Sequence, residues 1–340
     1  MIKRKTARSF LTFFHISAVP IVGMSFSCAG LDGGLGRPES AQERTKAPAI
    51  LILMPDSSSA QATLQGLRDE LEEDYDLIPR FVQSNTTPED VAQAVAELKP
   101  RVLVLMNNST LRLFRRYQQS YPDQTSIPAI ALLTSFLRES SQGIQNLTGI
   151  VYEVPLVTSL VNLRAILKEP LRRIGVIHRP SFRVFLEEQQ KLATEEGFTL
   201  VRSEVSGDGT PSVRKAIEKL REDERVDAIW VLNDNVLLSR LMLLRAWLPG
   251  LRRNETPVVV NVGTLLSRKT TFGTFAVLPD HRALGNQAGA LVSVVADHGW
   301  NTRGIQLEYP VSVEKVLDLE FARRHLEIQE NQLADIRVIK

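Results

Sequence analysis

The chain has 340 residues, of which 43% are apolar and 24% are charged, as in folded globular proteins rather than disordered or fibrous ones. Its 41 basic and 39 acidic residues give a formal charge of +2, which argues against general nucleic-acid binding because that function needs a concentrated basic surface. The one cysteine, Cys28, excludes an internal disulfide and a cysteine-based zinc site. The length favours two folding units after a leader.

Residues 1–28 have the order of a secretory leader. Four bases lie in residues 3–8, ahead of the apolar stretch Phe10–Met24 and the small residues around Cys28. The position of Cys28, directly after a small residue, resembles a bacterial lipoprotein site, and we expect this cysteine to be lipidated. Plain cleavage nearby, which leaves a free periplasmic protein, is the alternative. Residues 29–47 are rich in Gly, Pro and small polar residues and are expected to form a flexible tether.

From Ala49 the chain alternates between continuous apolar runs and helical patterns. Such runs are typical of strands that are buried on both faces of a parallel sheet. The first series predicts strands over 49–54, 77–81, 102–106 and 127–133, with helices over 61–73, 88–98 and up to Tyr117. Thr87 is the expected N-cap of the second of these helices, with Pro88 at its first position.

The same alternation restarts later in the chain, after a linking helix over Leu156–Leu167. The second series predicts strands over 173–178, 198–204, 227–232 and 257–260, with helices over 181–196, 211–221 and up to Trp247. The tail predicts strands over 272–278, 305–310 and 311–316, and helices over 280–298 and 320–326. Two such series indicate an α/β fold of two doubly wound parallel-sheet lobes, and the tail is expected to cross between them.

Polar residues follow the strands at the edge where open parallel sheets bind ligands, beyond the carboxyl ends of the strands. The expected ligand-binding residues of this kind are Ser57, Ser58, Ser59, Asn107, Asn108, Ser109, Thr110, Thr134, Ser135, His178 and Asn261. The serines can equally act as a helix cap and nothing more. The run from Asn107 to Thr110 suits an anionic group such as a carboxylate, because it leads into the start of a helix.

Phrases spaced along the chain resemble the type I periplasmic binding fold, and most of all the ABC-transporter substrate-binding family that includes tryptophan/phenylalanine-binding proteins. These phrases are Gln83-Ser84-Asn85, Leu98-Lys99-Pro100, Asn146-Leu147-Thr148-Gly149, Arg173-Ile174-Gly175-Val176-Ile177, Val226–Val231 with Asn233-Asp234-Asn235, Leu284–Gly289 and Leu319–Leu326. The resemblance implies one lobe of residues 48–150 and 265–301 and another of residues 155–263 and 302–340. It also assigns Asp234 and Asn235 to ligand contact, although Asp234 can equally be an ordinary N-cap.

Two departures from that family bear on the ligand. Its first loop usually carries an aromatic residue or histidine, where this chain has serines, and many relatives carry an acid after the strand that ends here at Val260. Asn261 stands in that place, so Asp234 is the nearest substitute as a partner for an amine. A less basic small molecule is therefore a second option beside an amino acid.

We therefore expect an exported, lipid-anchored, monomeric receptor that binds a small solute between two lobes and passes it to an ABC permease. We expect no nucleic-acid partner, no cofactor and no metal, since the histidines lack metal-ligand spacing. We also expect no catalysis, because the common hydrolase, metalloprotease and phosphate-loop motifs are absent from the sequence. Two alternatives stay open: a sensor that signals to a membrane kinase or chemoreceptor, and an enzyme whose site is assembled from distant loops.

Overall fold

A computed structural model describes residues 47–206, 209–251, 255–266 and 272–339. The expected leader, Cys28 and nearly all of the expected tether lie outside these residues. Among the described helices, none combines the length and the hydropathy needed to cross a bilayer.

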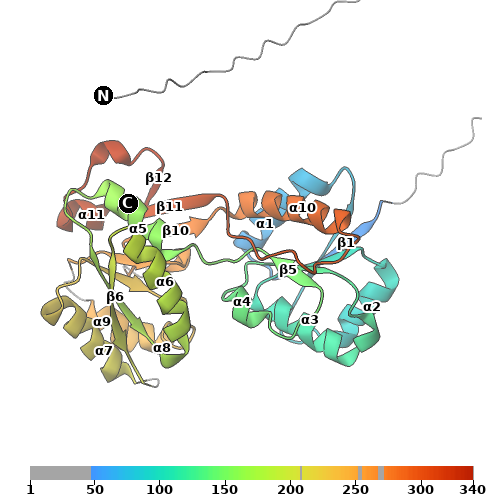
Figure 1. Cartoon of the computed structure of the whole chain (residues 1–340), viewed down its shortest axis with the longest axis horizontal. Helices are drawn as coiled ribbons and strands as arrows, with labels where there is room; N and C mark the ends of the chain where they lie inside the picture. Colours follow the sequence, from blue (N-terminus) through green and yellow to red (C-terminus); the bar gives the residue numbers. More distant parts are fainter. Residues whose placement is uncertain (1–46, 207–208, 252–254, 267–271, 340) are drawn as a thin grey trace, which may run out of the picture. The chain divides into compact units, whose positions relative to one another are not determined.

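The first lobe is built on a fully parallel five-stranded sheet with the strand order β2-β1-β3-β4-β5. Its strands are β1 (Ala49–Met54), β2 (Asp76–Phe81), β3 (Val102–Met106), β4 (Ala129–Leu132) and β5 (Leu147–Gly149). Its helices are α1 (Ser58–Leu71), α2 (Pro88–Leu98), α3 (Asn108–Ser120), α4 (Leu137–Ser140) and, from the tail, α10 (His281–Asp297). The strands alternate with crossover helices, as the sequence predicts (Figure 1).

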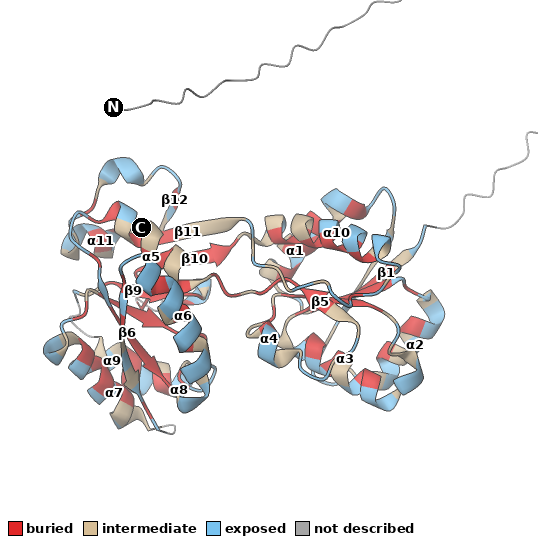
Figure 2. Ribbon diagram, viewed as in Figure 1, coloured by how far each residue is buried: buried red, intermediate tan, exposed pale blue. Residues whose placement is uncertain are grey.

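Both faces of this sheet are buried, which explains the continuous apolar runs. In β1, Ile50 and Ile52 pack on the face that α1 and α10 cover, whereas Leu51 and Leu53 pack on the face of α2 and α3. Figure 2 shows the central strands of both lobes as buried. Thr87 caps α2 as expected, since it accepts the Asp90 N–H while the Asp90 carboxylate accepts the Thr87 N–H, and Pro88 opens the helix.

The second lobe is built on a seven-stranded sheet with the order β12-β11-β10-β9-β8-β6-β7. Its strands are β6 (Arg173–His178), β7 (Thr199–Glu204), β8 (Ala228–Val231), β9 (Val258–Val260), β10 (Phe275–Pro279), β11 (Val313–Asp318) and β12 (Ile336–Ile339). Its helices are α5 (Leu156–Ile166), α6 (Arg183–Glu195), α7 (Thr210–Glu218), α8 (Arg240–Met242), α9 (Leu248–Gly250) and α11 (Leu319–His325). All neighbouring strands are parallel except β10 and β11.

Three segments of the chain connect the lobes. The first is residues 151–155, between β5 and α5, and the second is Asp280, between β10 and α10. The third is residues 309–312, because Glu308 still pairs with Ile150 beside the first sheet and β11 begins at Val313 in the second. The Asp280 N–H donates to the Ser312 carbonyl, so two of the connections are bonded to each other.

These connections correct the expected lobe boundaries. Residues 265–301 were expected in the first lobe, but β10 pairs with β9 in the second sheet, so the chain returns only at Asp280. Residues 302–340 were expected in the second lobe, but Thr302 bonds to Asn146 and Glu308 pairs with Ile150 in the first. An apolar run with no charge is compatible with either sheet, so its strand partner is decided by tertiary pairing. The expected strand 305–310 forms only the bridge at Glu308, and β12 was not anticipated.

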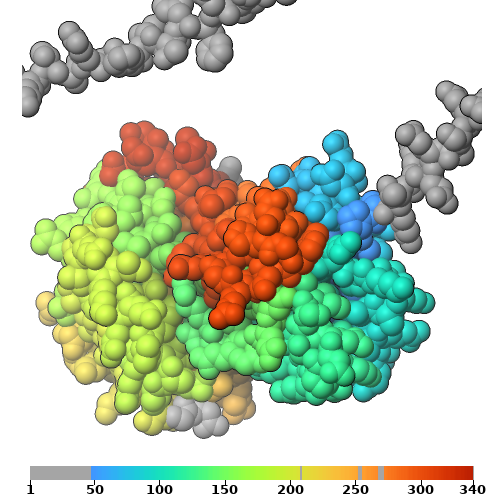
Figure 3. All heavy atoms as spheres, turned by 45° about the vertical axis from the view of Figure 1, so that its right-hand side comes forward, coloured from blue at the N-terminus to red at the C-terminus, as the bar shows by residue number. Residues whose placement is uncertain are grey.

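Helix α10 ties the tail to the first lobe by close packing against α1 (Figure 1). A Cβ atom built on Gly285 would lie 2.1 Å from the Thr63 carbonyl oxygen, and one on Gly66 would lie 2.0 Å from the Arg282 carbonyl oxygen. Only glycine fits this approach of two backbones. In Figure 3 the orange surface of α10 and the segment after it lies over the green surface of the first lobe, in agreement with the bridge from Glu308 to Ile150.

Candidate functional site

The serines that follow β1 form the start of α1. The Ser57 hydroxyl oxygen accepts the Ala60 N–H at 3.3 Å, which is an N-cap bond, and lies 3.2 Å from the Ser59 hydroxyl oxygen. Ser58 is exposed at the same place. Of the three serines, Ser57 therefore has the cap role that the sequence left open, and Ser58 presents its hydroxyl to solvent at the carboxyl edge of the sheet.

The residues that follow β3 are held in an unusual backbone conformation. Asn107 has φ 101° and ψ 169°, a region that few residues other than glycine adopt. Its side-chain oxygen accepts the N–H groups of Ser109 and Thr110 at 2.9 and 3.0 Å, and the Thr110 hydroxyl donates to the Asn107 carbonyl at 2.9 Å. The Ser109 hydroxyl in turn accepts from Arg112. The helix start expected to bind an anion is thus closed by its own side chains.

Asn108 joins the loops after β3 and β4. Its side-chain nitrogen donates to the Ser135 carbonyl at 2.8 Å, and its side-chain oxygen accepts the Ser135 N–H at 3.0 Å. Thr134 is fully buried, and its hydroxyl bonds to the Leu132 carbonyl. The structure therefore brings Asn108 and Ser135 together, as neighbouring strands predict, and makes Asn108 a clamp between the two loops.

In the second lobe, Asp234 is neutralised by an arginine. Arg179 donates to both carboxylate oxygens, at 2.6 and 2.8 Å, and the Asp234 side chain is only 1% exposed. One carboxylate oxygen also accepts the Val236 N–H at 2.8 Å, which closes a turn; the next helix, α8, begins only at Arg240, so Asp234 is not the N-cap that the sequence left open. Asp234 is thus no free partner for an amine, because its charge is already matched by a bidentate ion pair. Asn235 beside it is exposed.

Two amide groups at the same edge have unmet hydrogen-bonding capacity. Asn233 follows β8 and Asn261 follows β9, the neighbouring strand, and their residues are 9% and 8% exposed. Neither side-chain oxygen has a hydrogen-bond partner in the described structure. Since a buried polar atom without a partner costs about 1–3 kcal/mol, such atoms call for an explanation. His178, also at this edge, is 3% exposed and lies 3.1 Å from the Arg179 carbonyl through its Nδ1.

An aromatic contact between residues that the sequence analysis did not single out joins the lobes. The Phe136 ring, from the loop after β4, lies 5.2 Å from the Phe182 ring and 5.6 Å from the Phe185 ring, centroid to centroid, edge to face in both cases. The Glu153 carboxylate, in the first connecting segment, accepts the Phe136 N–H at 2.8 Å. Burial is the main cause that raises the pKa of the Glu153 carboxyl to about 7. No periodicity pairs residues 136, 153 and 182, so only the folded chain reveals this group.

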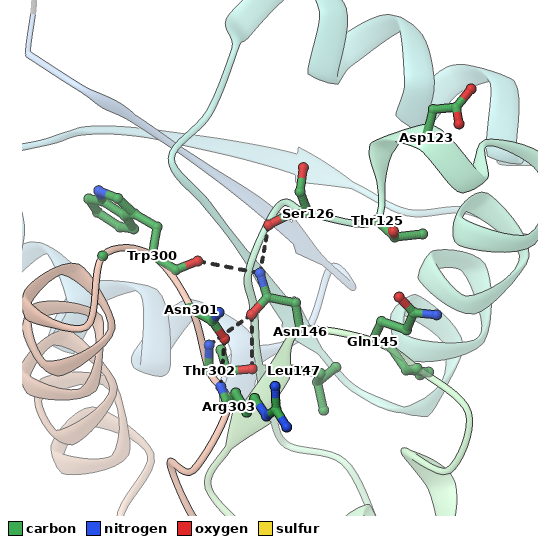
Figure 4. Close-up of a pocket in the computed structure, with 12 residues that line it drawn as sticks. Asp123, Thr125, Ser126, Gln145, Asn146, Leu147, Trp300, Asn301, Thr302 and Arg303 are labelled. Atoms are coloured by element: carbon green, nitrogen blue, oxygen red, sulfur yellow. Dashed lines mark hydrogen bonds between the residues drawn. The ribbon is translucent and has the colours of Figure 1, made fainter.

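A further groove lies at the opposite, amino edge of the first sheet. Its volume is about 740 Å³, and Figure 4 shows the residues around Asn146 that line it. The Asn146 side chain donates to the carbonyls of Ser126 and Trp300 and accepts the Thr302 N–H at 2.8 Å. Its amide is saturated by the protein, so Asn146 acts as a structural link between β4, β5 and the tail. Within the described residues, no cluster of three acids or histidines is arranged to hold a metal ion.

Solved structures share this fold. A ligand-free, open substrate binding protein with adhesive properties from Clostridium difficile matches with a TM-score of 0.65 and 15% identity, over 86% of this chain and 99% of that one. A conserved domain protein from Vibrio cholerae matches with a TM-score of 0.55 and 21% identity, over 87% and 100%. An ABC domain in complex with L-Trp from Streptococcus pneumonia matches with a TM-score of 0.53 and 18% identity, over 86% and 100%.

At these identities the likeness concerns the fold. No known protein family matches the chain, and no curated protein does. Each of these three structures matches more than four fifths of the chain, so the matches extend over both lobes. The chain has the two-lobed α/β fold of the type I periplasmic class, and the solved structures similar to it include an ABC transporter substrate-binding protein from Desulfitobacterium hafniense in complex with Leu, with a TM-score of 0.51 and 12% identity over 74% of this chain and 84% of that one.

Proposed function

We propose that the chain is the solute-binding receptor of an ABC importer. It binds a small molecule, amino acid-like or another small polar or aromatic solute, between its lobes and delivers it to a membrane permease. The observation that carries this proposal is the placement of polar loops beyond the carboxyl ends of strands in two separate parallel sheets. Crevices at this edge are where open α/β sheets bind their ligands. The likeness to ABC substrate-binding proteins supports the same reading.

The three connections between the lobes suit a receptor that closes on its ligand. A solute that touches both lobes stabilises their closed arrangement through contacts that the separated lobes lack. The connections absorb the movement as a hinge, because they are short segments between rigid sheets. In this proposal the chain makes and breaks no bond, and the permease recognises the closed form.

The side chains at the two edges favour recognition through hydrogen bonds rather than through a buried carboxylate. The amides of Asn233 and Asn261 have unmet acceptors, and Asp234 is already paired with Arg179. Ser58 and Asn235 are exposed at the two edges and are proposed to contact the solute from opposite sides. The complex of a similar domain with L-Trp makes L-tryptophan the first probe, with neutral polar solutes as the second set.

Export and anchoring at Cys28 are part of the proposal, with the chain acting as a monomer outside the cytoplasm. The leader-like order of residues 1–28 supports this placement. Cys28→Ser tests the anchor: membrane association is expected to be lost in a fractionation experiment with lipid labelling. Unchanged association of the Cys28→Ser chain would refute lipidation.

Calorimetric titration tests the receptor itself. The full chain is titrated with L-tryptophan, the other standard amino acids and a set of neutral polar solutes, and saturable one-to-one binding of at least one of them is expected. Asn261→Ala is expected to weaken that binding up to about tenfold, the value of one hydrogen bond. Asn331→Ala, an exposed asparagine of the same lobe, is the matched control and should bind as the unmutated chain does.

Three outcomes of this titration would contradict different parts of the proposal. Equal affinity of the Asn261→Ala and unmutated chains would reject the assigned site. The absence of saturable binding across the whole set would reject the receptor, and turnover of a bound solute would show an enzyme instead.

A further inference from the structure

Glu153 is a buried carboxylate in the first connection between the lobes. Its residue is 8% exposed, and it takes part in none of the ion pairs found among the described residues. Its Oε1 atom accepts the Phe136 N–H at 2.8 Å. Burying an ionised carboxylate without a cation costs free energy, so a buried acid at this place favours its protonated form.

Phe136 is the residue that this carboxylate holds. Its φ of 52° and ψ of 53° lie in the left-handed region, which costs an aromatic residue roughly 1–2 kcal/mol. In this conformation its ring reaches Phe182 and Phe185 of the second lobe. The hydrogen bond from the Phe136 N–H to Glu153 thus stabilises a strained backbone conformation at Phe136. That conformation places the Phe136 ring against the second lobe.

Both lobes contribute to the burial of Glu153. The cavity that it lines has a volume of about 30 Å³, room for little more than one water molecule. Phe136 and Leu137 line it from the first lobe, and Phe185 and Gln189 line it from α6 of the second. If the lobes separate, α6 leaves and the carboxylate gains water.

The charged and titratable groups around Glu153 do not neutralise it. From the first lobe, Glu139 raises its pKa further. Arg138 lines the same cavity, but its guanidinium lies 5.9 Å from the Tyr309 ring centre and is in no ion pair with Glu153 among the described residues. From the second lobe, Glu188 lines the same cavity. On its own segment, Tyr152 is stacked on His281, with 3.2 Å between the Tyr152 hydroxyl and the histidine Nε2. Burial lowers the pKa of His281, and neither this histidine nor Arg138 forms an ion pair with Glu153 in the described structure, so the carboxyl has no bound cation to hold it ionised.

We propose that the contact of Phe136 with the second lobe forms with uptake of a proton by Glu153, so that mild acid favours the closed arrangement of the lobes. The inference rests on the proposed function, because lobe closure is the step by which the receptor holds its solute.

The direction follows from proton linkage. With the lobes in contact, the pKa of Glu153 is raised to about 7, whereas separation and hydration return it toward its ordinary value of 4.5. Between these two values the closed arrangement binds one more proton than the separated one, so closure weakens as the pH rises. The ratio of closed to separated molecules should fall roughly tenfold between about pH 6 and about pH 8.

Distances between spin labels on the two lobes test this inference without any solute. Gln93→Cys in α2 and Lys191→Cys in α6 place one label on an exposed site of each lobe, in a full chain that also carries Cys28→Ser. The population at the short distance is expected to fall as the pH rises from about 6 to about 8. Glu153→Gln, which keeps the acceptor oxygen and cannot ionise, should hold the short distance at both pH values.

The matched control is Glu187→Gln, which removes an exposed carboxylate of α6 outside the cavity lining and should leave the pH response in place. Equal label distances at both pH values in the unmutated background, or an unaltered response in Glu153→Gln, would overturn the inference. If Glu153→Gln fails to fold, ¹³C NMR titration of the Glu153 carboxyl decides: a midpoint near 7 supports the inference and one near 4.5 overturns it. A solute set in which nothing binds would overturn the proposed function and leave these label distances unchanged.

Discussion

At the scale of single residues, the edge of the second sheet is organised by one ion pair. Asp234 is almost wholly buried and Arg179 is 30% exposed, so the arginine alone neutralises a charge that water cannot reach. Arg179 also lies 5.8 Å from the centre of the Phe182 ring, one of the rings that meets Phe136. The pair therefore links the loop after β8 to the contact between the lobes.

Removal of the arginine should destabilise the fold. Arg179→Ala leaves Asp234 buried without a cation, and the free energy of unfolding is expected to fall by about 3 kcal/mol in urea titrations. Arg183→Ala is the control, because Arg183 pairs with Glu204 in the same two-bond geometry but in solvent, where such pairs contribute little. Equal losses in the two variants would contradict this account of Asp234.

Asn107 tests whether the strained loop after β3 is held by its cap. Asn107→Ala removes the acceptor for two N–H groups and keeps a Cβ at φ 101°, so we expect a loss of about 1–2 kcal/mol in thermal or urea unfolding. Asn107→Gly also loses the cap but relieves the backbone, and should cost less than the alanine variant. A glycine variant less stable than the alanine variant would show that the backbone is not strained.

At the scale of elements, the packing of α10 on α1 fixes where the tail returns to the first lobe. Gly285→Ala would place a methyl group 2.1 Å from the Thr63 carbonyl oxygen, a distance that only a shift of the helices can relieve. We expect a loss of about 3 kcal/mol in unfolding free energy. Gly209→Ala is the control, because the nearest atom to its Cβ would be 3.5 Å away. A Gly285→Ala chain as stable as this control would contradict the close packing of the two helices.

Most strands and helices of both lobes follow from local patterns in the sequence, whereas α4, β5 and β12 were not predicted. Val102–Met106 is apolar at every position and forms the buried strand β3, and the Thr87-Pro88 pair starts α2 as predicted. The path of the tail could not be predicted from these local patterns. Phe275–Pro279 is apolar and fits either sheet, and only its pairing with Val258–Val260 assigns β10 to the second sheet. Local patterns set each element, and long-range pairing sets its neighbours.

The candidate site was predictable only in part. The candidate residues lie at the carboxyl edges, as the order of strands and helices predicts; among them are Asn107, which caps α3, and Asp234, which closes a turn. The side chains that bond to these residues could not be predicted from the sequence, since Arg179, the partner of Asp234, lies 55 positions away in the chain. The group of Phe136, Glu153 and Phe185 has no local signal, because each residue is ordinary in its own segment.

At the scale of the whole molecule, one buried carboxyl should make stability depend on pH. The pKa of Glu153 is raised to about 7 by burial, so between its ordinary value of 4.5 and about 7 the folded chain holds a proton that the unfolded chain has released. The free energy of unfolding is therefore expected to fall as the pH rises through this window. Urea titrations at several pH values measure it, and a Glu153→Gln chain with the same slope would contradict the assignment.

A crystal structure of the chain with its bound solute tests the central claim most directly, because it shows which edge of the sheets the ligand occupies. We predict that the solute touches both lobes beyond the carboxyl ends of their strands, with Ser58 on one side and Asn235 or Asn261 on the other. A solute held instead in the groove beside Asn146 and Trp300, at the amino edge of the first sheet, would contradict the claim.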